Sequence, residues 1–141
     1  MKTFLKALPV PLLILLYCYA ALSKLLDTDA FREQLYNQTF PHVLADPLLY
    51  GLPLTELLTV ALLVMPRTQF AGLLLSFSLL LLFSGYIALV LLGYWNRVPC
   101  SCGGILSRMS WQTHLLFNLA FLGINAFAIS RPATLPVTVH D

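Results

Sequence analysis

Long apolar runs alternate with short polar connections along this chain of 141 residues. A membrane-spanning helix needs about 20 predominantly apolar residues, and four stretches come close to that length. They run from about residues 4 to 22, 48 to 65, 70 to 94 and 111 to 129. The pattern predicts an all-α protein, built as a four-helix transmembrane bundle.

The polar connections divide the chain in a simple way. Residues 24–47 are expected to form the longest loop, which holds most of the acidic residues. Residues 66–69 are expected to form a tight turn, and residues 95–110 a loop that carries two cysteines. We therefore predict one membrane domain over residues 1–130, followed by a flexible C-terminal tail over residues 131–141.

Composition supports a membrane protein and excludes other classes. Hydrophobic residues make up 59% of the chain and charged residues 10%, whereas soluble domains have about a quarter of their residues charged. Mean hydropathy is +0.83. The net charge of +2, with no basic run, gives no indication of a nucleic-acid partner. The composition therefore predicts a protein that is surrounded by membrane lipid.

The orientation of the bundle is only weakly encoded. With four spans both termini share one side, and each side receives four Lys or Arg residues. Lys2 and Lys6 flank the first span, which usually dominates orientation. We expect cytoplasmic termini, with the cysteine loop facing the periplasm or an equivalent compartment. The same two lysines before an apolar run also describe a secretory signal peptide cleaved near Ala20-Ala21, and this alternative stays open.

The strongest candidate for chemistry is Cys100-Ser101-Cys102, followed by Gly103 and Gly104. A disulfide between cysteines one residue apart closes a small ring, which departs from relaxed geometry and is easily reduced. The spacing therefore favours a redox-active pair. Two alternatives remain: the cysteines bind a metal ion, or they have no redox role. No metal site is predicted, because zinc sites prefer wider spacing and four ligands, and His114 is the single nearby candidate.

Chain topology gathers the other candidates near these cysteines. In a four-span bundle, the end of the first span, the start of the second, the end of the third and the start of the fourth share one membrane face. Lys24, Glu56 and His114 are therefore expected at the face that carries Cys100 and Cys102. Glu56 is expected about eight residues inside its helix, roughly 12 Å below the interface.

Each supporting residue has a functional and a structural interpretation. His114 titrates near neutral pH and is a candidate proton carrier for a thiol or a bound quinone. Glu56 is the single acid within a span, and such residues are functional candidates with Lys24 or His114 as partner. A structural ion pair is the alternative. Asn118 and Asn125 lie on the stripe that begins at His114, and either can serve as interhelical hydrogen-bonding glue.

Several runs in the chain resemble a known family. The cysteine loop with the start of the fourth span, residues 99–111, is the most specific of them. Tyr19-Ala20-Ala21-Leu22-Ser23-Lys24-Leu25, Pro53-Leu54-Thr55-Glu56-Leu57-Leu58 and Gly85-Tyr86-Ile87-Ala88 add one run from each of the other spans. Together they resemble the DoxX-like, methylamine-utilisation MauE family of bacterial redox-associated membrane proteins, over residues 1 to about 130.

The resemblance implies a bacterial inner-membrane protein that supports thiol–disulfide maturation of periplasmic proteins, beside a thioredoxin-like partner or client. The outline is also similar to the vitamin K epoxide reductase bundle, an analogy at the level of fold alone. That enzyme has Cys-x-x-Cys at a helix start and a second cysteine pair, and this chain has neither. A partner is therefore expected to supply the other thiols.

These observations lead to one functional hypothesis and two alternatives. Cys100 and Cys102 exchange electrons with a periplasmic protein, His114 moves the proton, Glu56 and Lys24 set the electric field, and a quinone is a candidate carrier. The first alternative is a non-enzymatic subunit that scaffolds an envelope complex. The second is a small transporter or metal-handling protein.

Overall fold

The computed structural model describes residues 7–37, 41–93 and 110–130, which form five helices. They are α2 (Pro9–Leu26), α3 (Thr28–Tyr36), α4 (His42–Val64), α5 (Gln69–Leu91) and α6 (Trp111–Ile129). All except α3 are long and apolar enough to cross a membrane. The prediction of an all-α bundle with four spans is confirmed, and the chain is a multi-pass membrane protein.

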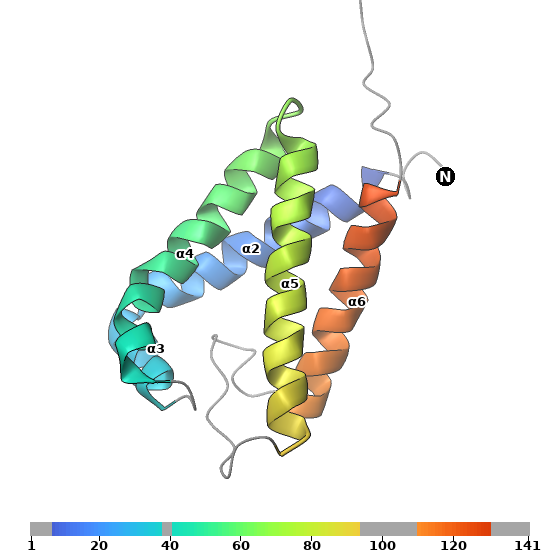
Figure 1. The fold of residues 1–141 in the computed structure, drawn as a ribbon. Helices are drawn as coiled ribbons and strands as arrows, with labels where there is room; N and C mark the ends of the chain where they lie inside the picture. The colour runs from blue at the N-terminus through green and yellow to red at the C-terminus, as the bar shows by residue number, and fades with distance from the viewer. Residues whose placement is uncertain (1–6, 38–40, 94–109, 131–141) are drawn as a thin grey trace, which may run out of the picture.

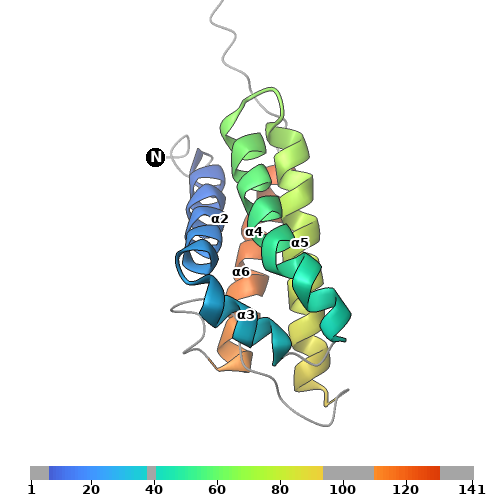
Figure 2. The same ribbon diagram turned by 90° about the vertical axis from the view of Figure 1, so that its left-hand side faces the viewer.

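The four long helices form a closed ring. Helix α4 packs against α2 and α5, α5 packs against α6, and α6 returns to α2. A tight turn joins α4 to α5 at one end of the bundle, and from there the two helices diverge toward the other end (Figure 1). The short helix α3 lies at that other end, together with the end of α5 and the start of α6 (Figures 1 and 2).

The two helices of the tight turn approach so closely that α5 needs a glycine there. A Cβ atom on Gly72 would lie 2.9 Å from the backbone nitrogen of Leu63 on α4. The Thr68 hydroxyl, just before α5, donates to the Leu62 carbonyl at 3.0 Å. Small residues allow this kind of backbone approach between membrane helices.

Apolar side chains cover the outside of the bundle, and polar ones are gathered inside. Leu15, Leu82 and Leu116 are 66%, 71% and 68% exposed. The buried polar and charged residues are Lys24, Glu56, Thr59, Ser76, Ser84, Asn118 and Asn125. Lipid tails are as apolar as leucine, so exposed leucines carry no penalty in a bilayer, whereas unpaired polar groups must turn inward.

The prediction of a loop over residues 24–47 was wrong for most of that stretch. Helix α2 continues to Leu26, and α3 follows after one residue, with the Asp27 carboxylate accepting a hydrogen bond from the Ala30 backbone nitrogen at 3.1 Å. Phe31 and Leu35 of α3 are buried against α4. A nine-residue helix carries its stability in such packing rather than in its local sequence.

Helix α4 begins at His42 instead of near Leu48, and it continues through Pro47 and Pro53. Proline removes a backbone donor from a helix interior, and Pro47 with Asp46 before it interrupts the apolar run, so the pattern predicted a start near residue 48. Glu56 therefore lies fourteen positions after the first residue of α4, deeper along the helix than predicted.

Candidate functional site

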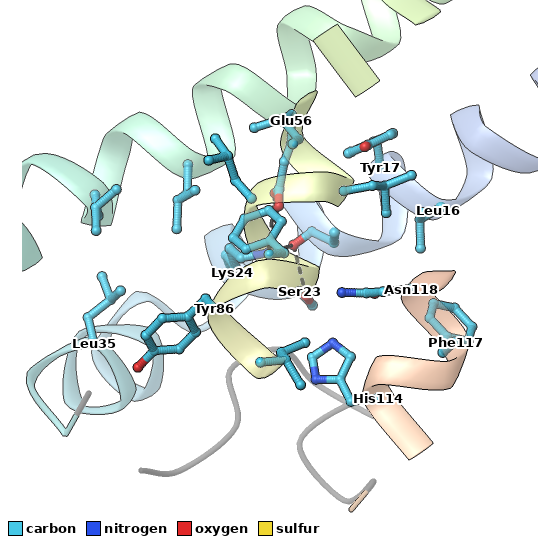
Figure 3. Close-up of a pocket in the computed structure, with 18 of the residues that line it drawn as sticks. Leu16, Tyr17, Ser23, Lys24, Leu35, Glu56, Tyr86, His114, Phe117 and Asn118 are labelled. Atoms are coloured by element: carbon cyan, nitrogen blue, oxygen red, sulfur yellow. Dashed lines mark hydrogen bonds and ion pairs between the residues drawn. The ribbon is translucent and has the colours of Figure 1, made fainter. Parts of the chain in front are cut away.

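A cavity of about 360 Å³ lies inside the bundle, and all five described helices contribute to its wall. Most of the lining side chains are leucines and aromatic rings. The polar ones are Tyr17, Ser23, Lys24, Glu56, Tyr86, His114 and Asn118. Figure 3 shows Lys24 near the middle of this group, Glu56 reaching it from α4, and His114 and Asn118 facing it from α6.

The charged pair in the cavity wall is fully coordinated. The Nζ atom of Lys24 lies 2.9 Å from Oε1 and 3.2 Å from Oε2 of Glu56. It also donates to the Ala20 carbonyl at 3.1 Å. The Lys24 and Glu56 side chains are only 9% and 3% exposed. All three ammonium donors therefore have acceptors, and the two charges cancel within the protein.

Helix α3 covers this pair from one side. The Phe31 ring, buried on α3, lies with its centroid 5.8 Å from Nζ of Lys24. That distance allows a cation–π attraction. Helix α3 thus does more than connect two spans, because it closes the end of the bundle over the Lys24 ammonium.

Helix α6 supplies the remaining polar groups from its first two turns. It begins after Ser110, whose hydroxyl accepts from the Thr113 backbone nitrogen at 3.2 Å. His114 follows, and its Nδ1 atom is buried with no hydrogen-bond partner among the described residues. Asn118 is 6% exposed and lines the cavity, and the described part of the chain gives its amide no hydrogen-bond partner either.

A second polar cluster lies beside the cavity and is satisfied internally. The Tyr17 hydroxyl donates to the Ser76 carbonyl at 3.0 Å. The Asn125 amide contacts the Ser76 hydroxyl at 2.6 Å. With its oxygen toward Ser76, that amide donates to the Leu73 carbonyl at 3.1 Å. The cluster joins α2, α5 and α6, in agreement with the structural interpretation of Asn125.

Sequence reasoning did not single out Tyr17 or Ser76 as partners of Asn125. The available signal was the presence of single polar residues inside otherwise apolar spans, because each such residue needs a partner in hydrocarbon. Which span supplies the partner depends on helix rotation, and the sequence pattern leaves that undetermined.

Aromatic rings line the cavity next to α6. The Tyr86 and Trp111 rings meet edge to face, with centroids 6.4 Å apart. Phe83 and Phe117 also line the wall. These rings form an apolar surface suited to a flat ring system.

The structure brings together four of the six candidate residues, Lys24, Glu56, His114 and Asn118, around one cavity. Cys100 and Cys102 lie outside the described residues. They belong to the connection between the end of α5 at Leu91 and the start of α6 at Trp111. Cys18 on α2 is a half-buried free thiol. Within residues 7–37, 41–93 and 110–130, no three His, Cys, Asp or Glu side chains are grouped to hold a metal ion.

Comparison with known proteins gives one positive result. The family model described as methylamine utilisation protein MauE matches residues 1–131. No curated protein and no solved structure matches the chain.

Proposed function

Since the chain belongs to the MauE family of methylamine utilisation proteins, we propose that it is an integral membrane thiol–disulfide protein. In this proposal the Cys100-Ser101-Cys102 pair forms or reduces disulfides in a periplasmic protein partner. The role in methylamine utilisation is maturation of such a partner. The substrate is then a protein thiol rather than methylamine itself.

One observation carries the proposal. The buried Lys24–Glu56 pair and the side chains of His114 and Asn118 line one cavity. The cavity also includes Trp111, the first residue of α6, to which the cysteine-bearing connection runs. Intramembrane charged groups are expensive and mark functional sites by default.

The proposed exchange moves two electrons and two protons between a client protein and the cysteine pair. When two client thiols close to a disulfide, two electrons and two protons pass to the Cys100–Cys102 disulfide, which opens to two thiols. His114, at the cavity wall, is the proposed proton carrier, since imidazole gains and loses protons near neutral pH. The Lys24–Glu56 pair sets the electric field around His114. The exchange with a client dithiol can also run in the reverse direction.

A lipid-soluble quinone is the proposed acceptor that returns the cysteine pair to its disulfide state. It would supply that oxidation by taking up two electrons and two protons.

The cellular setting is part of the proposal. We place the protein in a bacterial inner membrane, with its termini in the cytoplasm and the cysteine connection in the periplasm. Disulfides persist in that compartment. A thioredoxin-like protein is the expected partner, and kinship with DoxX-like proteins is the expected wider relationship.

The experiment that tests the proposal replaces both cysteines by serine in the full-length protein. We expect the thiol–disulfide state of periplasmic client proteins, measured by alkylation and mass shift, to change in the Cys100→Ser/Cys102→Ser variant. An unchanged client redox state with defective assembly of an envelope complex would instead identify a scaffold.

A further inference from the structure

The Asn118 amide lies in the cavity wall and hydrogen-bonds to no other described residue. The residue is 6% exposed, lies in an apolar-lined cavity and has no hydrogen-bond partner among the described residues. Asn125, seven positions later on the same helix, is fully buried and contacts Ser76 at 2.6 Å. An amide that faces an apolar-lined cavity has hydrogen-bonding capacity that a ligand in the cavity can use. Asn118 is therefore the side chain of the cavity wall best placed to bond to such a ligand.

We propose that this cavity binds an uncharged, ring-bearing, lipid-soluble molecule whose carbonyl or hydroxyl oxygen hydrogen-bonds to Asn118. The chemical class is that of the quinones. The electron-carrying role of such a ligand rests on the proposed function above. Its binding at this cavity does not, because no cysteine takes part in it.

The charge of the site selects a neutral ligand. Lys24 and Glu56 are the charged residues among the described lining, and they neutralise each other. The Lys24 ammonium already has three acceptors at 2.9, 3.2 and 3.1 Å. Among the described lining residues no charge remains to offset an ionic head group, whose transfer into this interior is unfavourable.

The shape and lining select a ring over a bare acyl chain. The volume of about 360 Å³ falls within the range of about 300–1,000 Å³ that small-molecule sites occupy. Phe83, Tyr86, Trp111 and Phe117 contribute aromatic surface to the wall. Aromatic groups attract flat rings in stacked and edge-to-face arrangements, and a saturated chain gains less from them.

The route of entry is from the bilayer. Leu82 lines the cavity and is also 71% exposed on the outside of the bundle. It lies in the second half of α5, and α5 diverges from α4 away from the tight turn that joins them (Figure 1). A ligand dissolved in the lipid therefore meets the cavity wall without first crossing the aqueous phase.

The test uses the full chain in lipid nanodiscs and the fluorescence of Trp111. The chain has two tryptophans, so a Trp95→Phe background, excited at a wavelength that tyrosine does not absorb, leaves Trp111 in the cavity wall as the single emitting tryptophan. We expect decylubiquinone to quench this emission saturably. In the Asn118→Leu variant the apparent Kd should rise about tenfold, because the ligand loses one hydrogen bond. Leu119→Ala, at a lipid-facing neighbour that is 48% exposed, should leave the Kd unchanged.

Three results would overturn the inference. They are an equal Kd in the Asn118→Leu variant, quenching that never saturates, and displacement of decylubiquinone by an equal amount of decylbenzene, which has a ring and chain but no oxygen. Folding is checked by thermal unfolding, where Asn118→Leu should be at least as stable as the parent because it breaks no hydrogen bond in the described bundle. Asn118→Ala provides a second variant.

Ligand binding by a variant without Cys100 and Cys102 distinguishes this ligand site from the proposed thiol–disulfide role. Decylubiquinone should bind the Cys100→Ser/Cys102→Ser variant with the parent Kd. If it does, and client proteins keep their redox state in that variant, the thiol–disulfide role fails while the ligand site stands. If binding is absent but client redox changes, the ligand site fails and the thiol–disulfide role stands.

Discussion

The Lys24 Nζ atom lies 2.9 Å from Oε1 of Glu56, joining the last turn of α2 to the middle of α4 inside the bundle. The contact is bidentate, and the Ala20 carbonyl and the Phe31 ring complete the surroundings of the ammonium. Two helices far apart in the sequence are thereby held in one register. Because the two charges cancel, the described wall of the adjoining cavity has no net charge.

Removing one partner of this pair should be more harmful than removing both. Glu56→Gln or Lys24→Met leaves a buried charge without a counter-ion, which costs about 3–5 kcal/mol. The double variant Lys24→Met/Glu56→Leu removes both charges and should recover most of that loss. Unfolding in detergent, followed by helical circular dichroism, measures the difference. Single variants as stable as the double variant would contradict a coupled ion pair.

The Ser76–Asn125 contact should make a measurable contribution to stability. Asn125→Leu and Ser76→Ala each break a buried hydrogen bond and leave a partner unsatisfied, for an expected loss of about 1–3 kcal/mol. Ser78→Ala is the matched control, because Ser78 on the same helix is exposed and bonds only to the Leu74 carbonyl. A double-mutant cycle between positions 76 and 125 should show coupling, whereas additive losses would argue against the contact.

Gly72 should tolerate no side chain, in contrast to Gly85 on the same helix. A Cβ at position 72 meets the α4 backbone at 2.9 Å, whereas a Cβ at position 85 has nothing within 4 Å. We expect Gly72→Ala to lose about 1–3 kcal/mol through overpacking. Gly85→Ala should lose nothing, because alanine is the better helix former. Equal unfolding midpoints for the two variants would contradict the close approach of α4 and α5.

The sequence pattern predicted the spans because an apolar run of about twenty residues is typical of a membrane-spanning helix and of few other structures. It also placed Lys24, Glu56 and His114 toward one end of the bundle, since chain direction alone determines that. It missed α3 because a nine-residue polar helix has no distinctive composition, and its two buried residues find their partners only in α4. It missed the early start of α4 because Asp46 and Pro47 interrupt the apolar run just before residue 48.

The site was less predictable than the fold. Nothing in the spacing of Asn118 and Asn125 indicates that one amide is bonded and the other is not. That difference depends on which residue of α5 faces each turn of α6, and on the divergence of α4 from α5 that opens the cavity. Both are properties of helix packing, and neither has a local sequence signal.

The hydrogen bond between α3 and α4 gives a pH-dependent prediction. The Tyr36 hydroxyl donates to the Asp46 carboxylate at 2.5 Å, which raises the pKa of the Tyr36 phenol above its usual value of 10. The folded protein therefore holds this proton more tightly than the unfolded chain does. The stabilisation is present below pH 10 and is lost as the pH rises through the raised pKa.

The titration of Tyr36 can be followed by NMR with ¹³C-labelled tyrosine, and Tyr36→Phe assigns its signal. Asp46→Asn removes the charged acceptor and should lower the pKa of Tyr36 toward 10. A Tyr36 pKa unaffected by Asp46→Asn would mean that the two side chains do not bond in solution.

The thiol–disulfide role is tested most directly by the redox state of Cys100 and Cys102 in intact membranes. Thiol alkylation and mass shift would report it, with and without an inhibitor that blocks oxidation of the quinone pool. A pair that accumulates in the reduced form when the pool is blocked is the predicted result, because its electrons then have no acceptor. A pair that stays in one state under both conditions would contradict the account.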